Sequence, residues 1–431
     1  MIDRYTRPAM AQLWSEENKF AVWLDIEILV SEKLAQMGII PRGVPSRMRK
    51  RARFDVERIE RIEAETRHDV IAFLKDVGRH LGDDEQYLHY GLTSSDVVDT
   101  ALAVRMVQAG DLLLQALNPP IRRTAALARR YIDTPIAGRT HGVFAEPTAL
   151  GLKFALWHAD LKRGRRRLRS AIYGIAVGKL SGAVGNFAHL DPRVEAYVCR
   201  KLGLRPAPIS TQVLQRDRHA EYIFAVAALG ATIEKIAQEI RLLHRTETGE
   251  LTEGFASGQR GSSAMPHKQN PITCERLCGL ARVLRGYVIP ALENVALWHE
   301  RDITHSSAER VVIADATTLL DYMLGLLDYV LGTLGVHPDR MLENLRRLGS
   351  EMFSQRLLLA LAEGLGSRDQ AYAIVQRIAL ERKGQTTFED RVRADQIVRR
   401  HLAERQLDSV FDLRPYLRRS RLILKRALAQ S

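Results

Sequence analysis

Cysteine is scarce in this sequence: its 431 residues include only three, Cys199, Cys274 and Cys278. Three cysteines cannot form a disulfide framework in a chain of this length, and such a composition fits a reducing compartment. Cys274 and Cys278 are spaced as on one helix face, and no His or Cys stands at zinc-finger spacing from them. We therefore expect small buried thiols and no metal site.

Long apolar runs are also missing. The longest extends from Tyr222 to Ile233, well short of the ~20 residues that a membrane-spanning helix needs. The first residues, Met1 to Pro8, carry charge and are not followed by the apolar core of a signal peptide. The expected protein is soluble and cytoplasmic, with no membrane partner.

The charge is unbalanced. Lys and Arg number 64 against 51 Asp and Glu, a formal net charge of +13. Such an excess suits nucleic acid, an anionic membrane surface or small acidic substrates. The best support for nucleic acid is the basic run from Lys162 to Arg169, but such runs are usually solvated helix faces, and we expect no nucleic-acid partner.

Alternating β patterns are nearly absent, and apolar residues recur instead at steps of three and four. One series is Leu229, Ile233, Ile236, Ile240 and Leu243, and similar series run through residues 150–161, 277–287 and 320–334. Seams of this kind are typical of long helices packed nearly parallel. They predict an all-α fold with a long central helical bundle flanked by two smaller helical domains.

Glycine- and proline-containing breaks suggest domain limits at 1–93, 94–345 and 346–431. Three stretches within the central part are predicted as loops: 134–147, 182–192 and 249–271. Rigid helices that present polar loops at their ends place function in those loops.

The most unusual loop, residues 258–271, combines two hydroxyl groups, a His, a Lys and an amide. Lys268 and Asn270 could together hold a carboxylate, the Lys as a point charge and the Asn as a directed donor. The alternative is a solvated surface loop in which Ser262 or Ser263 is a turn residue.

Other clusters indicate proton transfer and anion binding. His141 lies in a loop between Gly138 and Gly142, and histidine is the usual proton carrier near neutral pH. Thr93 and Ser94 precede a predicted helix, where they could hold an anion. Ser94 or Ser95 with Asp96 could equally be an N-cap for a helix starting at Val97.

Ser306 and Arg310 are four residues apart on one predicted helix face, with Arg301 just upstream, and two guanidinium groups plus a hydroxyl suit a phosphate. No phosphate-binding Walker loop, dinucleotide fingerprint or Gly-x-Ser-x-Gly elbow is present. Their absence argues against ATP hydrolysis, nicotinamide chemistry and esterase chemistry.

Residues 261–271 resemble the signature loop of the fumarase/aspartase superfamily of lyases. The motifs that resemble the adenylosuccinate lyase family within it are residues 66–70, 90–100, 138–142, 210–213 and 301–310. The resemblance implies elimination of fumarate from adenylosuccinate, giving AMP, and from the succinylated aminoimidazole carboxamide ribotide (SAICAR to AICAR). It also implies no metal or organic cofactor, and a homotetramer whose active sites are shared among three subunits.

The resemblance further implies roles for single residues. His141 would be the general acid, with Glu275 favouring its protonated form, and Ser262 the general base, with Ser263 as the adjacent alternative. Lys268 and Asn270 would hold the succinyl carboxylate, and His68 would support the leaving group or phosphate. The residues implied in binding phosphate are Arg4, Tyr5, Arg301, Ser306 and Arg310. Those implied in binding the rest of the nucleotide are Arg67, Asp69, Thr93, Ser94 and Gln212, with Arg276 as a weaker candidate.

Two alternatives stay open on the sequence. One is another fumarate-releasing lyase or a cycloisomerase of the same superfamily. The other, from a different class, is a basic helical nucleic-acid-binding protein.

Overall fold

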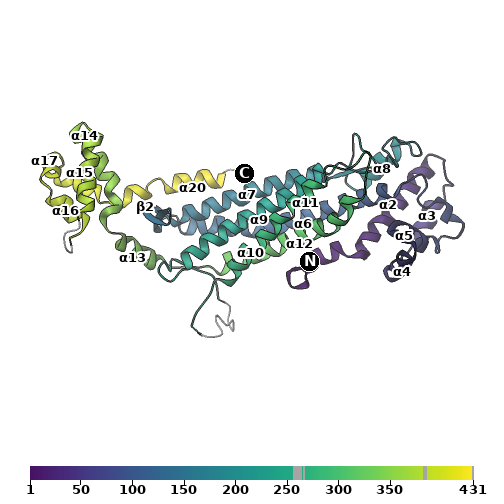
Figure 1. Cartoon of the computed structure of the whole chain (residues 1–431), viewed down its shortest axis with the longest axis horizontal. Helices are drawn as coiled ribbons and strands as arrows, with labels where there is room; N and C mark the ends of the chain where they lie inside the picture. The colour runs from purple at the N-terminus through teal and green to yellow at the C-terminus, as the bar shows by residue number, and fades with distance from the viewer. Residues whose placement is uncertain (256–264, 266, 382–385, 430–431) are drawn as a thin grey trace. The chain divides into compact units, whose positions relative to one another are not determined.

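The computed structural model describes residues 1–255, 265, 267–381 and 386–429. Ser262 and Ser263, the two candidates for the general base, lie outside these residues. Helices dominate the described chain (Figure 1), so the predicted all-α class is confirmed. None of the described helices is both long enough and apolar enough to span a membrane.

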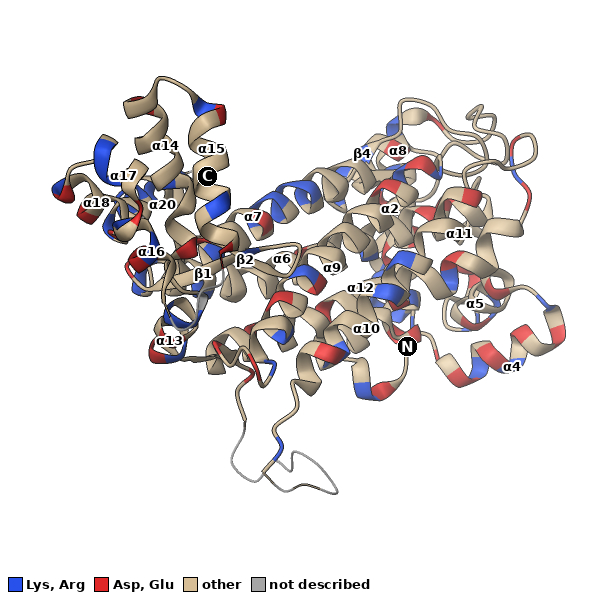
Figure 2. Cartoon of the chain, turned by 60° about the vertical axis from the view of Figure 1, so that its left-hand side comes forward, with Lys and Arg blue, Asp and Glu red and all other residues tan. Residues whose placement is uncertain are grey.

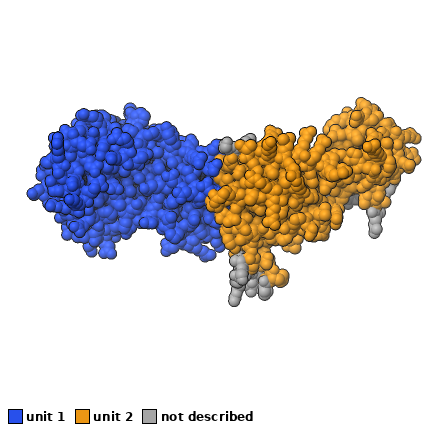
Figure 3. Space-filling model, turned by 180° about the vertical axis from the view of Figure 1, so that it is seen from behind, with its two compact units in different colours: residues 1–118, 163–235, 276–327 blue, residues 119–162, 236–275, 328–431 orange. Residues whose placement is uncertain are grey.

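The chain forms two compact units, which are coloured separately in Figure 3. Unit 1 comprises residues 1–118, 163–235 and 276–327, and unit 2 comprises residues 119–162, 236–275 and 328–431. The long helices α6, α7, α9, α10 and α12 contribute residues to both units. The three-domain division at 93 and 345 stays a prediction.

Unit 1 begins with short helices around an aromatic core. Phe20, Trp23 and Phe73 are buried and in mutual ring contact, with centroids 5.3–5.7 Å apart. The elements of this region are η1 (Asp3–Tyr5), α1 (Pro8–Trp14), α2 (Glu16–Gln36), α3 (Val44–Arg51), α4 (Val56–Thr66), α5 (Asp69–Gly78), η2 (Gly82–Tyr87) and α8 (Pro192–Lys201).

The long helices that contribute to both units lie side by side (Figure 1). They are α6 (Ser94–Arg130), α7 (Leu150–Ile175), α9 (Asp217–His244), α10 (Ile272–Gly286) and α12 (Thr304–Thr333), with the short α11 (Val288–Glu293) between the last two. The seam from Leu229 to Leu243 is buried along α9, as its spacing predicts. Close packing needs small residues: a Cβ at Gly110 of α6 would lie 2.4 Å from Ile172 of α7.

Unit 2 carries the ends of these helices, a β-hairpin and a set of short C-terminal helices. The C-terminal helices enclose a second core that includes Phe353, Leu361 and Phe388. Their bounds are α13 (Pro338–Leu348), η3 (Ser350–Phe353), α14 (Ser354–Leu365), α15 (Arg368–Leu380), α16 (Phe388–Ala394), α17 (Gln396–His401), α18 (Glu404–Val410), α19 (Arg414–Leu417) and α20 (Ser420–Ala429).

The predicted loop at 134–147 is wrong. Strand β1 (Pro135–Thr140) pairs antiparallel with β2 (Val143–Ala149), with Pro135 opposite Ala149. His141 and Gly142 form the two-residue turn, with φ of 54° and 76°, as tight hairpin turns require. Two further sheets are minimal: β3 (Val177–Gly178) with β4 (Arg205–Pro206), and β5 (Leu251–Thr252) with β6 (Gly335–Val336).

Buried ionisable groups in the described chain are mostly acidic. Eleven carboxylate side chains are buried, against three side chains of Lys and Arg: Arg105, Lys179 and Arg216. Lys179 and Arg216 form ion pairs with buried carboxylates, as buried charges must to offset their lost hydration. Figure 2 marks several basic positions along α7, and of these Arg166, Arg167 and Arg169 are exposed.

Candidate active site

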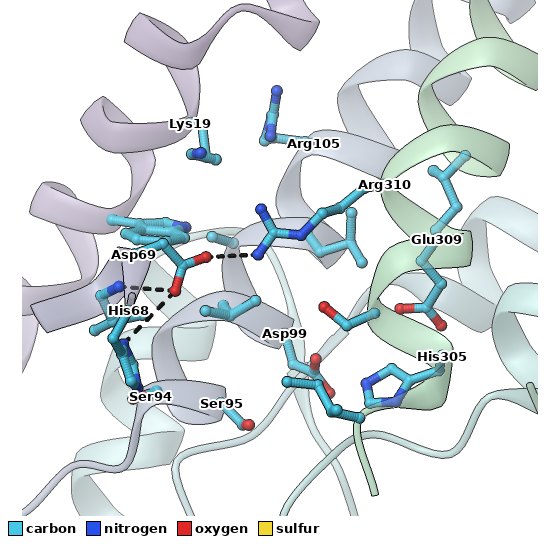
Figure 4. Close-up of a pocket in the computed structure, with 18 of the residues that line it drawn as sticks. Lys19, His68, Asp69, Ser94, Ser95, Asp99, Arg105, His305, Glu309 and Arg310 are labelled. Carbon is cyan, nitrogen blue, oxygen red and sulfur yellow. Dashed lines mark hydrogen bonds and ion pairs between the residues drawn. The ribbon is translucent and has the colours of Figure 1, made fainter. Parts of the chain in front are cut away.

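Unit 1 contains a pocket with a volume of about 600 Å³ between α2, α5, α6 and α12 (Figure 4). It brings together nine of the residues that the sequence motifs suggested. They are Arg67, His68, Asp69, Thr93, Ser94, Gln212, Arg301, Ser306 and Arg310. Residues up to 243 positions apart in sequence, Arg67 and Arg310, thus line one pocket.

The first group comes from the junction of α4 and α5. Arg67 ends α4 in the left-handed conformation, with φ of 55°, and so turns the chain toward the pocket. His68 is the N-cap of α5, and its Nδ1 accepts a hydrogen bond of 3.3 Å from the Ile71 N–H. A ring whose Nδ1 accepts carries its proton on Nε2 when neutral, so the outer nitrogen of His68 can donate.

Asp69 and Arg310 face each other across the pocket (Figure 4) and form an ion pair of 2.6 Å between Oδ2 and Nη2. Burial acts to raise the pKa of Asp69, but the hydrogen bond and charge of Arg310 and the Val70 N–H outweigh it, so the pKa lies below its usual value. Asp69 is therefore ionised at neutral pH and fixes the direction of the Arg310 guanidinium.

Thr93 and Ser94 stand at the start of α6. The Thr93 N–H donates to Oδ2 of Asp96 at 2.9 Å, which closes the first turn. As a result α6 begins at Ser94, earlier than the predicted start at Val97. The hydroxyl-bearing residues are partly exposed in the pocket wall, next to the N–H groups of a helix start.

The third group consists of side chains from two loops, Gln212 and Arg301, and of side chains from α12. Nη1 of Arg301 donates to Oε1 of Gln212 at 2.9 Å, which holds both side chains in one orientation. Nε of Arg301 is buried and has no hydrogen-bond partner within the described ranges. Ser306 lies one helical turn before Arg310 on α12. The group therefore offers donors suited to an anion.

Sequence reasoning missed a buried ionic network whose three residues also line this pocket. Nη1 of Arg216 is 2.6 Å from Asp99, and its Nε is 2.8 Å from Glu309. Burial opposes ionisation of Asp99, but the Arg216 charge and hydrogen bonds lower the Asp99 pKa to about 2. Asp99 and Glu309 stand inside the recognised motifs, and their place there was the one available signal.

Two histidines beside this network are held neutral. Burial, with the Arg216 charge adding to it, lowers the pKa of His219 to about 3. The same two causes lower the pKa of His305 to about 4. His305 also lines the pocket (Figure 4), so at pH 7 it presents an uncharged ring there.

Three predicted binding residues of unit 1 lie outside the lining of this pocket. Tyr5 contacts Tyr322, with ring centroids 5.1 Å apart. Arg276 donates from Nη1 to the Tyr322 hydroxyl at 3.1 Å, so Tyr322 links it to Tyr5. Arg4 is exposed in the adjacent turn.

Unit 2 carries the remaining described candidates. His141 is exposed at the tip of the β1–β2 hairpin, and Lys268 is exposed just before α10. Asn270 is partly exposed there, and Glu275 is exposed in the first turn of α10. Among the described residues of one chain, neither a hydrogen bond nor an ion pair joins His141 to Glu275, and their roles stay predictions.

Buried carboxylates hold both segments that bear these candidates in unit 2, the β1–β2 hairpin and the start of α10. Arg139, in the His141 hairpin, makes two hydrogen bonds of 2.8 Å to the buried Glu250 carboxylate. The buried carboxylate of Glu253 accepts from the N–H groups of Thr273 and Cys274 at 2.9 and 2.7 Å, which caps α10. The described residues contain no group of His, Cys, Asp and Glu side chains arranged to hold a metal ion.

Comparison with known proteins identifies the family. A family model described as lyase matches residues 3–286, and one described as adenylosuccinate lyase C-terminus matches residues 351–427. The chain is 49% identical over 427 residues to adenylosuccinate lyase from Bacillus subtilis, covering 99% of both chains. It is 48% identical over 419 residues to the enzyme of that name from Thermotoga maritima, covering 97% of both. This chain belongs to the adenylosuccinate lyase family.

Solved structures show that the fold is shared with other lyases and with a lactonizing enzyme. A fumarate lyase from Mesorhizobium sp. BNC1 superimposes with a TM-score of 0.90 at 27% identity, and the match covers 100% of each chain. A 3-carboxy-cis,cis-muconate lactonizing enzyme from Pseudomonas putida gives 0.87 at 26% identity, covering 99% of this chain and 97% of that one. The suggested resemblance and the lyase class are confirmed.

Proposed function

We propose that the chain catalyses the cofactor-independent β-elimination of fumarate from adenylosuccinate, giving AMP, and from SAICAR, giving AICAR, in purine nucleotide biosynthesis. The observation that carries this proposal is the identity of 47–49% to three curated adenylosuccinate lyases over nearly their full length. The pocket in unit 1 supports it, because its donors and cations suit an anionic nucleotide. The proposed location is the cytoplasm.

We assign phosphate binding to the two arginines and the serine that the loop before α12 and α12 itself contribute to the pocket. Arg301, Ser306 and Arg310 supply two guanidinium groups and a hydroxyl, and Arg4 and Tyr5 would complete the phosphate site. Arg310 is already oriented by Asp69 at 2.6 Å, so less side-chain entropy is lost when an anion binds. The rest of the nucleotide would be held by Arg67, Asp69, Thr93, Ser94 and Gln212, with Arg276 as a weaker candidate.

Elimination needs three chemical functions. A base removes the proton beta to the leaving nitrogen, an acid protonates that nitrogen, and a cation stabilises the charge that collects on the succinyl carboxylate. We assign these to Ser262, to His141 and to Lys268 with Asn270, respectively. Ser263 is the alternative base, Glu275 would favour protonated His141, and the Nε2–H of His68 would support the leaving group.

The proposed enzyme is a homotetramer in which three subunits contribute to each active site. The exposed position of His141 at a hairpin tip supports such sharing, because this side chain can reach a neighbouring subunit. The anchoring of Arg139 to Glu250 would keep the hairpin rigid while it does so.

The direct test is turnover of adenylosuccinate to AMP by the purified protein without added metal, followed by the change in purine absorbance. Argininosuccinate and carboxymuconate serve as comparison substrates, because related lyases and cycloisomerases share this fold. Turnover of adenylosuccinate alone supports the proposal; turnover of a comparison substrate alone would refute it.

A second test addresses the shared site. Two folded but inactive variants, His141→Gln and Ser262→Ala, are mixed under conditions that exchange subunits. Partial recovery of activity is expected, since some sites then receive an intact His141 and an intact Ser262 from different chains. Failure of two well-folded variants to complement each other would contradict the shared site.

A further inference from the structure

Lys179 is a fully buried lysine that follows β3 in unit 1, and it is not among the residues that line the pocket. A buried ammonium group is costly unless all of its three N–H donors are paired. Here Nζ is 2.6 Å from Oδ1 of Asp96, and it donates to the Gly182 carbonyl at 3.1 Å and to the Gln212 carbonyl at 2.8 Å. Each donor thus reaches a different chain segment.

Asp96 extends this arrangement to the start of α6. Its Oδ1 also accepts from the Gly182 N–H at 3.2 Å, and its Oδ2 accepts from the Thr93 N–H at 2.9 Å. Asp96 itself is fully buried, so these contacts are shielded from water. The Lys179–Asp96 pair therefore joins the backbone of Thr93 to the backbone of Gln212.

Both of these endpoints belong to the pocket. Thr93 and Gln212 line it, and Oε1 of Gln212 in turn accepts from Arg301 at 2.9 Å. The main chain of Lys179 is fixed to α6 as well, because its N–H donates to the Thr100 hydroxyl at 3.1 Å and its carbonyl accepts from that hydroxyl at 2.9 Å. One side chain thus connects two groups of residues that line the pocket.

We propose that Lys179 is a positioning residue of the nucleotide site, which acts through Asp96 and Gln212 to hold the Thr93–Ser94 segment and the Gln212–Arg301 pair at a fixed separation. This inference rests on the proposed function of the pocket. An apolar side chain of similar volume could fill the same space, although replacing Lys179 alone leaves the buried Asp96 carboxylate without its partner and so also lowers stability. It could not, however, bond three segments at defined angles.

The test compares Lys179→Met with wild type in steady-state kinetics on adenylosuccinate. Positioning of ground-state binding groups predicts a rise in KM of about ten-fold with kcat kept within about three-fold. Lys179→Gln, which keeps amide N–H donors on a side chain one bond shorter, should give a smaller rise. If Lys179→Met does not fold, Lys179→Gln serves as the test variant instead.

Asp76→Asn is the matched control. Asp76 is equally buried in unit 1 and pairs with Arg58 at 2.9 Å, but it lies outside the pocket lining. The control should lower the melting temperature and leave KM unchanged. An equal rise in KM in the control, or a wild-type KM in both Lys179 variants, would overturn the proposal.

A readout that needs no turnover separates this proposal from the proposed function. Hydrogen exchange is measured in the peptides that contain Thr93 and Gln212, in wild type and in the Lys179 variants. Faster exchange in both peptides of the variants is expected, and unchanged exchange would overturn the positioning role. An inactive wild type would refute the proposed function, while the exchange result would still decide the role of Lys179.

Discussion

His219 couples the stability of unit 1 to pH, and the size of the effect follows from its burial. Its folded pKa is about 3, against about 6.5 for an unperturbed histidine. Above pH 6.5 the imidazole is neutral in both the folded and the unfolded chain, and it adds no pH dependence. Below pH 6.5 the unfolded chain binds a proton that the folded chain does not, so the free energy of unfolding falls as the pH falls.

Integration between these two pKa values gives a loss of about 2 kcal/mol at pH 5 relative to pH 8. For a chain of 431 residues this corresponds to a drop in melting temperature of about 2 °C. His305, with a folded pKa of about 4, adds a loss of similar size at pH 5. The variant His219→Gln should therefore retain about half of the pH dependence that the two histidines cause together.

The assay is thermal unfolding of wild type and His219→Gln at pH 8 and pH 5, at constant ionic strength. The quantity compared is the difference in melting temperature between the two pH values, so any change in stability common to both pH values cancels. His189→Gln, at an exposed position, is the control and should behave like wild type. The same pH dependence in His219→Gln as in wild type would refute the reasoning.

Four further outcomes are expected. Glu253→Gln should lower the melting temperature, since loss of the charged cap of α10 costs about 1 kcal/mol, measured by thermal unfolding. Asp69→Asn should raise KM for adenylosuccinate by about three- to ten-fold in steady-state kinetics, because Arg310 is no longer oriented. Arg139→Lys should lower kcat about ten-fold, measured by single-turnover kinetics, because the bidentate contact that anchors the His141 hairpin is lost. Dialysis against a chelator should leave kcat unchanged, since we propose a reaction that uses no metal.

Each of these expectations has a contrary outcome. A melting temperature of Glu253→Gln equal to wild type would show that the α10 cap adds no net stability. An unchanged KM in Asp69→Asn would show that Asp69 does not contribute to substrate binding. A wild-type kcat in Arg139→Lys would show that the hairpin anchor does not affect catalysis. If dialysis abolished activity and added metal restored it, the cofactor-independent mechanism would be contradicted.

Helices were predictable from the sequence because burial repeats with the helical period. The series through Leu229 and Ile236 lies on the buried side of α9, as its spacing required. The hairpin was not predictable in this way. Its strands are short and interrupted: the register shifts between Ala137 and Arg139, and Gly138 gives no side-chain signal. The C-terminal helices matched no motif, although a family model covers residues 351–427.

In the candidate site, only residues that belong to recognisable local motifs were predictable from the sequence. Motifs placed His68, Ser94 and Arg310 in one site, and the pocket contains all three. The ionic network of the same pocket joins Arg216 to Asp99 and Glu309, which are 117 and 93 residues away in sequence. Partners so far apart leave no periodic or local pattern, so their pairing emerges only from the folded chain.

The unequal burial of acids and bases changes how the charge of this protein acts on its surroundings. Among the described residues eleven carboxylates are enclosed against three Lys and Arg side chains, so the solvent-facing surface they form is more positive than their composition alone would give. A dissolved polyanion therefore meets an attractive field before it touches any binding residue, and the frequency of productive encounters rises. Added salt screens this field over about 10 Å at 0.1 M, so capture of a phosphate-bearing metabolite should slow with ionic strength even where the chemical step is unaffected.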